Sequence, residues 1–106
     1  MRRLSVLLTI AAATGAAAQA PSAPVAEGDP AQGAAMTRKD CDGCHIRRFG
    51  DVAAAYTRLD RRVNTPAQLK AQIAVCNSQL GTGYFPDEEA HIAAYLNREY
   101  YRFPAP

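Results

Sequence analysis

The chain has 106 residues, of which 48% are hydrophobic and 21% are charged, and its formal net charge is +2. This length suits one small domain and argues against a multidomain enzyme. So small a net charge gives no reason to expect a nucleic acid or an anionic membrane surface as a partner.

Residues 1–20, "MRRLSVLLTIAAATGAAAQA", have the layout of a secretory signal peptide. Two arginines precede an apolar run that is too short to remain as a membrane span, and small residues follow. We expect cleavage after Ala20, with Ala18 as the alternative, and export to a bacterial periplasm. Residues 21–28, rich in Pro and Ala, are predicted to be a disordered leader before a single domain over residues 29–106.

The first helix of that domain is predicted to begin after Asp29, which can cap it, with Pro30 in its first turn. It should run to about Lys39. Gly33 inside it indicates close contact with another element. The stretch from 46 to 64 is predicted to be mostly loop, with a short helical turn at "DVAAAYTRL".

Two further helices are predicted in the second half of the chain. Thr65, Pro66 and Gln68 form a strong start signal with a capping box. Four residues of this helix share one face: Leu69, Ile73, Cys76 and Leu80. The last helix has acidic residues in its first turn, an apolar stripe of Ile92, Tyr95 and Leu96, and a tail expected to fold back on the body, Tyr100, Tyr101 and Phe103. With no strand pattern, the expected fold is all-α with three to four helices.

The sharpest motif is "CDGCH", which contains Cys41, Cys44 and His45. Two thiols separated by two residues can each bond one vinyl group of a haem, and the adjacent histidine supplies an axial ligand to the iron. A zinc site would need a second pair of ligands, and a thioredoxin-like dithiol would need a βαβ context. A plain disulfide is the remaining alternative. The motif therefore predicts one covalently attached haem c.

The segments around the motif resemble those of a known family. "GDPAQGAAMTRKDCDGCH" resembles the opening of class I cytochromes c, and "HIAAYLN" resembles their closing helix. The resemblance implies a small class I-like monohaem cytochrome c, with its helices around the haem. It implies Gly33 and Tyr95 as the crossing pair of the two helices. Thr37 departs from the family, which usually has an aromatic residue there, and Met36 is the candidate to fill that space.

The sixth iron ligand is less obvious from the residues. Class I cytochromes use a distal methionine, but Met1 belongs to the signal and Met36 lies on the leading helix beside the haem. The far side is then left to Cys76, Asn77, His91 or an open site. His91 is predicted to be a surface or capping residue, whereas Cys76 lies on an apolar helix face after a long loop.

A second resemblance concerns Cys76. "VAAAYTRLDRRVNTPAQLKAQIAVCNSQLG…EEAHIAAYL" resembles the haem domain of the SoxA subunit of thiosulfate-oxidising cytochromes, and this implies Cys76 as iron ligand opposite His45. Thiosulfate dehydrogenase cytochromes use the same His/Cys pair. Asn77 and Leu80 depart from that family, in which an arginine and a methionine are found. A buried free thiol and an intermolecular disulfide remain as alternatives for Cys76.

"CNSQLG" also resembles the sphaeroides haem protein, an oxygen-binding cytochrome with a displaceable asparagine ligand and a disulfide-bonded cysteine. The positions that correspond to the asparagine and to the disulfide partner are Val75 and Tyr84 here. Neither residue can take its counterpart's role, and this leaves Cys76 free to ligate. Asn77 lies one position past the apolar face.

The expected function is that of a periplasmic monohaem c-type cytochrome that transfers electrons, rather than a stand-alone enzyme. Its partner would be a redox protein or a larger oxidoreductase complex, including one that acts on sulfur compounds. One alternative is a haem protein that binds O₂ or NO through a displaceable distal ligand. The other is a haem subunit that takes part in thiosulfate or sulfite chemistry. Four arginines are candidates for haem propionate contacts or partner docking: Arg47, Arg48, Arg61 and Arg62.

Overall fold

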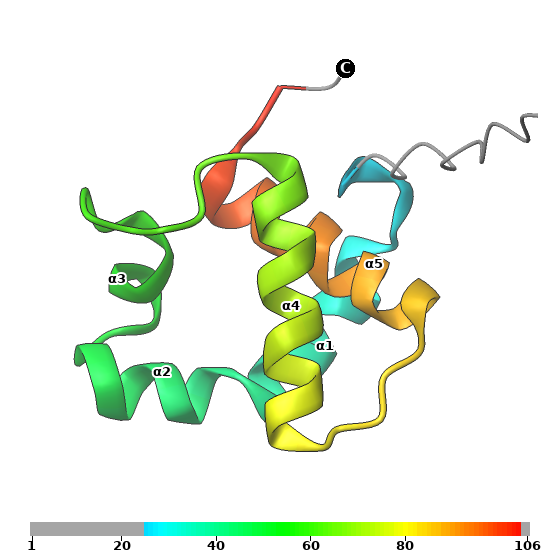
Figure 1. The fold of residues 1–106 in the computed structure, drawn as a ribbon, viewed down its shortest axis with the longest axis horizontal. Helices are drawn as coiled ribbons and strands as arrows, with labels where there is room; N and C mark the ends of the chain where they lie inside the picture. The colour runs from blue at the N-terminus through cyan, green and yellow to red at the C-terminus, as the bar shows by residue number, and fades with distance from the viewer. Residues whose placement is uncertain (1–24, 105–106) are drawn as a thin grey trace, which may run out of the picture.

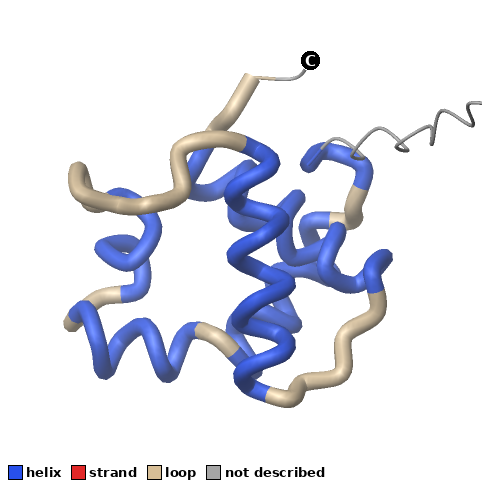
Figure 2. Tube along the Cα trace, in the orientation of Figure 1, coloured by secondary structure: helices blue, strands red, loops and turns tan. Residues whose placement is uncertain are grey.

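The computed structural model describes residues 25–104, so the predicted signal peptide over residues 1–20 lies outside the described part. The elements are η1 (Val25–Glu27), α1 (Pro30–Asp40), α2 (Asp42–Phe49), α3 (Val52–Thr57), α4 (Pro66–Leu80), α5 (Pro86–Leu96) and η2 (Asn97–Tyr101) (Figure 1). Helices and loops account for this whole range, without a strand (Figure 2). The all-α prediction is confirmed, with five α-helices in the described range instead of three to four. No helix within this range is both long and apolar enough to cross a bilayer.

The centre of the fold is the pair α1 and α5, which make the most extensive contact between elements. Gly33 on α1 lies directly on the backbone of His91 and Ile92, so close that a Cβ at position 33 would overlap the His91 carbonyl. The predicted close contact at Gly33 is therefore present. The crossing point lies at His91, however, and not at Tyr95 as the resemblance implied. Tyr95 is buried in the core, one helical turn further along α5.

The start of α1 is fixed by two capping contacts. The Asp29 carboxylate accepts a hydrogen bond from the Ala31 N–H at 2.9 Å, which satisfies one of the unpaired donors of the first turn. The backbone N–H of Asp29 donates to Nδ1 of His91 at 2.8 Å. His91 therefore acts as a capping residue at the start of α1, as predicted.

The leader prediction is corrected for its last four residues. Val25 is only 6% exposed and belongs to the hydrophobic core, and η1 packs against α5. A Cβ at Gly28 would overlap the carbonyl of Ala90. Residues 25 to 28 are thus part of the folded domain, because an apolar side chain and a glycine fit them to α5.

The prediction of a loop from residue 46 is also corrected. Helix α2 continues through the motif to Phe49 and ends at Gly50, whose φ of 81° is the left-handed conformation that glycine adopts easily. Only Gly50 and Asp51 separate α2 from α3. This short connection makes a corner and brings α3 back towards the beginning of α2, and the two helices pack together. The short helix predicted around residue 56 is confirmed.

Helix α4 has the predicted bounds. The Thr65 side chain accepts from the Gln68 N–H at 3.1 Å, and the Gln68 side chain accepts from the N–H of Asn64 at 2.8 Å. On the predicted apolar face, Leu69 and Ile73 are buried. Leu80, the last residue of the helix on the same face, is 47% exposed.

The aromatic tail folds back on the body, as predicted. Helix α5 continues into the π-helical turn η2, which carries Tyr100 onto Tyr56, with ring centroids 4.8 Å apart and planes 27° apart. Tyr101 stacks on Phe103 at 5.5 Å. The Asn97 side chain holds this turn by accepting from the Phe103 N–H at 2.8 Å.

We expect Gly33→Ala to destabilise the protein by more than about 3 kcal/mol, the upper range for overpacking, because the obstacle is backbone that cannot rotate away. The gain of about 1 kcal/mol in helix propensity from Gly to Ala does not offset this clash. Thermal unfolding followed by circular dichroism is the measurement. Gly43→Ala on the exposed face of α2 is the matched control, since its Cβ would meet only the tip of Arg47, at 3.5 Å. Equal melting temperatures for the two variants would contradict the close crossing of α1 and α5.

Candidate functional site

The motif lies at the junction of α1 and α2. Cys41 is the residue between the two helices and is half-buried, Cys44 is exposed, and His45 is half-buried. Residues three and four apart lie on the same side of a helix. Cys44 and His45, three and four residues after Cys41, therefore lie on the same side of the beginning of α2 as Cys41. This arrangement would let all three side chains bind a single group.

His45 is held by Tyr56 of α3. Its Nδ1 and the Tyr56 hydroxyl oxygen are 2.6 Å apart and hydrogen-bonded, and the two rings meet edge to face at 4.9 Å. Burial lowers the pKa of His45, and the negative charge of Asp42 opposes this shift. The imidazole is thus favoured in the neutral form that binds metals, with Nδ1 engaged and Nε2 left for a ligand bond.

Tyr56 is fixed from several directions. It is only 5% exposed, and burial raises its pKa. Its carbonyl accepts a hydrogen bond from Arg61 at 2.9 Å, and the Arg61 guanidinium lies 5.0 Å from the centre of the Tyr101 ring. Arg61 is therefore half-buried and engaged with the aromatic cluster, which makes it the least available of the four arginines suggested for propionates or docking.

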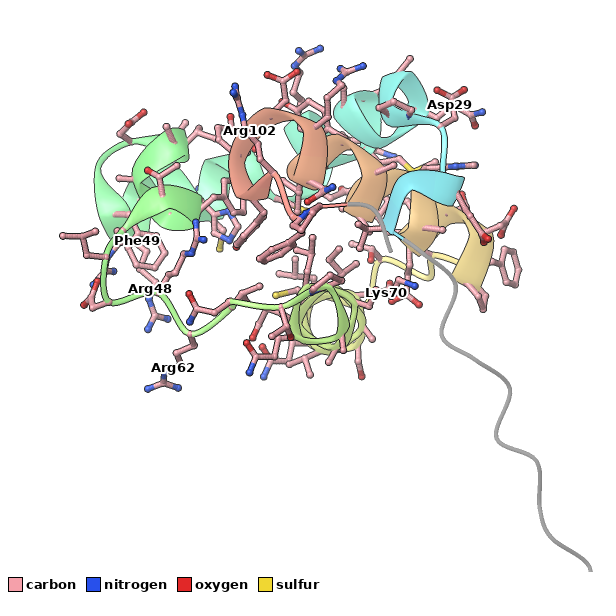
Figure 3. All side chains as sticks on the ribbon, turned by 90° about the horizontal axis from the view of Figure 1, so that it is seen from above. Asp29, Arg48, Phe49, Arg62, Lys70 and Arg102 are labelled. Atoms are coloured by element: carbon pink, nitrogen blue, oxygen red, sulfur yellow. The ribbon has the colours of Figure 1, made fainter. Side chains whose placement is uncertain are left out.

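The other arginines of this region lie around Phe49. The guanidinium groups of Arg48 and Arg58 are 5.6 and 4.9 Å from the centre of its ring. Figure 3 shows Arg48, Phe49 and Arg62 at one end of the molecule and Asp29 at the opposite end. Arg47, Arg48 and Arg62 are exposed, so this end presents positive charge to the solvent.

Cys76 lies half-buried on α4, and its sulfur accepts a hydrogen bond from the Gln72 amide at 3.3 Å. Burial, and then the charge of Cys76, raise the pKa of the Cys41 thiol to about 11. Burial raises the pKa of Tyr101, the positive charge of Arg61 lowers it, and the charge of Cys76 raises it further. The sulfur of Cys76 is therefore close enough to Cys41 and Tyr101 to act on both.

The raised pKa of Cys41 bears on the dithiol alternative. Cys-X-X-Cys pairs that exchange disulfides depend on a thiolate, with its pKa lowered to about 7 or below. Cys41 has the opposite shift, and its thiol stays protonated at neutral pH. All three cysteines are free thiols in the structure. Cys41 thus lacks the electrostatic activation that a thiol–disulfide oxidoreductase gives its attacking thiol.

Asn77, the neighbouring candidate for a distal ligand, is engaged in the turn after α4. Its amide nitrogen donates to the Tyr84 carbonyl at 2.8 Å, while its oxygen accepts from the Tyr84 N–H at 3.1 Å and from the Thr82 hydroxyl at 2.5 Å. The Tyr84 hydroxyl donates in turn to Asp40, beside Cys41. Any ligand role for Asn77 would break this turn, whereas Cys76 holds only the Gln72 contact.

Three observations test whether these residues fit a haem. None of the eight residues of α2 is fully buried, although an isolated helix of this length is unstable in water. The main partner of α4 is α5, and neither α2 nor α3 is among its extensive contacts. Figure 1 shows α2 and α3 at the left of the fold, with α4 at the centre and α5 at the right. Ile46 on α2 and Val75 on α4 are each 47% exposed. A large apolar group bonded to α2 fits this incomplete packing.

The polar groups around the motif are not all paired, and they form no metal-ion cluster within the described range. Asp42 Oδ1 is buried without a hydrogen-bond partner among the described residues. Within that range, no three His, Cys, Asp or Glu side chains gather as a site for a bare metal ion. A haem iron would take only one or two axial ligands from the protein, so a single histidine such as His45 is enough to begin such a site.

Sequence reasoning identified the residues of the motif but missed Tyr56. The tyrosine follows His45 by 11 residues, and only the corner at Gly50 returns it to the imidazole. The sole sequence signal is a tyrosine inside a short stretch of small apolar residues. In the comparisons with known proteins, no family model, curated protein or solved structure matches this chain.

Proposed function

We propose that this protein is an exported monohaem c-type cytochrome that transfers electrons. The observation that carries the proposal is the motif Cys41, Cys44 and His45, with His45 neutral and held at Nδ1 so that Nε2 is free to bind iron. The incomplete packing of α2 supports it, because a haem bonded to this helix would cover apolar side chains such as Ile46 that the chain itself leaves exposed.

Each residue has a defined part in this function. Cys41 and Cys44 form the thioether bonds, and His45 is the proximal ligand. We assign Cys76 as the distal ligand in its thiolate form, since it shares a helix face with Leu69 and Ile73 and Asn77 is engaged elsewhere. The haem would supply a one-electron redox couple. A thiolate donates more charge than a thioether and stabilises the ferric state, so the potential should be low.

A low potential indicates the kind of partner. Such a protein accepts electrons from strongly reducing donors, which include sulfur-compound oxidoreductases, and acts as carrier or subunit for them. The exposed arginines Arg47, Arg48 and Arg62 next to the motif favour docking with an acidic redox partner.

Intact-protein mass spectrometry after acid–acetone extraction tests the proposal directly. We expect one haem mass that stays with a chain cleaved after Ala20 or Ala18, because thioether bonds resist this extraction. Expression in a host with the c-type maturation machinery is required. Haem that extracts into the organic phase, or a chain without any haem mass, would refute the proposal.

The spectrum of the same sample separates electron transfer from gas binding. A low-spin ferric haem whose reduced form is indifferent to CO supports a carrier with two protein ligands. A high-spin haem that binds CO would favour the gas-binding alternative.

A further inference from the structure

We infer that the hydroxyl of Tyr56 positions His45 by accepting a hydrogen bond from its Nδ1–H, and so fixes the tautomer that binds iron and strengthens its donation. This inference rests on the proposed function and extends it to a residue outside the motif. The observation is the 2.6 Å contact between the two side chains, which come from different helices.

The direction of this hydrogen bond follows from the chemistry of imidazole. A neutral histidine has one N–H and one lone pair in its ring. If Nε2 gives its lone pair to iron, the proton must be on Nδ1, and the Tyr56 oxygen is the group in reach to accept it. A partner at the outer nitrogen of a ligating histidine sets its orientation and raises its basicity.

Tyr56 is rigid enough for this task. Its ring is stacked on Tyr100, meets Tyr101 at 6.0 Å and is almost fully buried. Arg61 bonds its backbone carbonyl at 2.9 Å. These contacts fix the phenol, and a fixed acceptor holds the imidazole in one orientation about its ring axis.

A phenol oxygen that accepts from His45 has its own proton available for another acceptor. Asp42 begins α2 three residues before His45, so the two side chains lie on the same side of this helix. Its Oδ1 atom is buried and has no partner among the described residues. Asp42 thus offers an unused acceptor on the His45 side of α2.

The test compares Tyr56→Phe with Tyr95→Phe in the haem-loaded protein. Both variants remove one hydroxyl from the same aromatic cluster and keep the ring, but only Tyr56 is hydrogen-bonded to His45. We expect Tyr56→Phe to shift the reduction potential upward, because a less basic imidazole stabilises ferric iron less. We also expect loss of the slowly exchanging Nδ1 proton of ¹⁵N-labelled His45 in the NMR spectrum. Tyr95→Phe should change neither.

The outcomes distinguish this inference from the function on which it rests. A parent protein without covalent haem overturns the proposed function itself. A haem-bearing parent with an unchanged potential and a retained Nδ1 proton in Tyr56→Phe overturns only the role of Tyr56. Equal shifts in both variants would also overturn it, because they would reflect ring packing. If Tyr56→Phe does not accumulate, 3-fluorotyrosine at position 56 replaces it. Its weaker acceptor oxygen should give a smaller upward shift, and an unchanged potential would overturn the inference.

Discussion

Replacing Cys41 and Cys44 together by alanine is expected to yield a haem-free and largely unfolded chain. Cleavage after Ala20 leaves 86 of the 106 residues, and cores of this size are marginal without a cofactor, a metal or a disulfide. The chain's own contacts hold α1 against α5 firmly, but α2 buries no residue and α4 packs mainly on α5. Loss of the proposed haem, which would join α2 to the rest, should therefore unfold more than the motif.

Far-UV circular dichroism and the yield of soluble exported protein measure this effect. Since net stabilities of domains are about 5–15 kcal/mol, loss of the central apolar contacts should leave little folded protein at 25 °C. Lys39→Ala is the control, because this side chain is exposed at the end of α1 and outside the motif. A colourless double variant with native-like helicity would show that the helices form their core without the haem.

The helices with strong end signals were predictable from sequence. Helices α1 and α4 begin with a capping side chain followed by proline, and α5 begins with Pro86 and three acidic residues. Such signals are local, so that a few adjacent residues decide them. The course of α2 was not predicted, because its eight residues are too few for periodicity to decide and its end depends on the left-handed turn at Gly50.

The same difference applies to the site. Cys41, Cys44 and His45 form one contiguous motif whose meaning depends on spacing alone. The partner of His45 depends on the corner between α2 and α3, which no local pattern of residues specifies. Cys76 falls between these cases, because its helix face was evident from periodicity, while what that face meets depends on how α4 packs on α5. Leu80 is 47% exposed, which shows that a shared helix face does not by itself make a residue buried.

Replacing Cys76 by alanine is expected to convert the ferric haem from low spin to high spin and to raise its reduction potential. Alanine offers no ligand, and the neighbouring Asn77 is engaged by three hydrogen bonds in the turn to Tyr84. The open position should then bind CO in the ferrous state and cyanide in the ferric state. Loss of the thiolate's charge removes stabilisation of ferric iron, and this gives the upward direction of the potential.

Visible and near-infrared spectra with a redox titration measure this change. Ser78→Ala is the matched control, since it removes a small polar group from an exposed position two residues further along α4. Cys76→Met should restore a low-spin haem with a potential above that of the parent, because a thioether donates less charge than a thiolate. If Cys76→Ala keeps the parent's spectrum and potential, the cysteine is a core thiol or a bridge between two chains. A non-reducing gel of the parent protein then separates these two cases, because only the bridge migrates as a dimer that reducing agent dissociates.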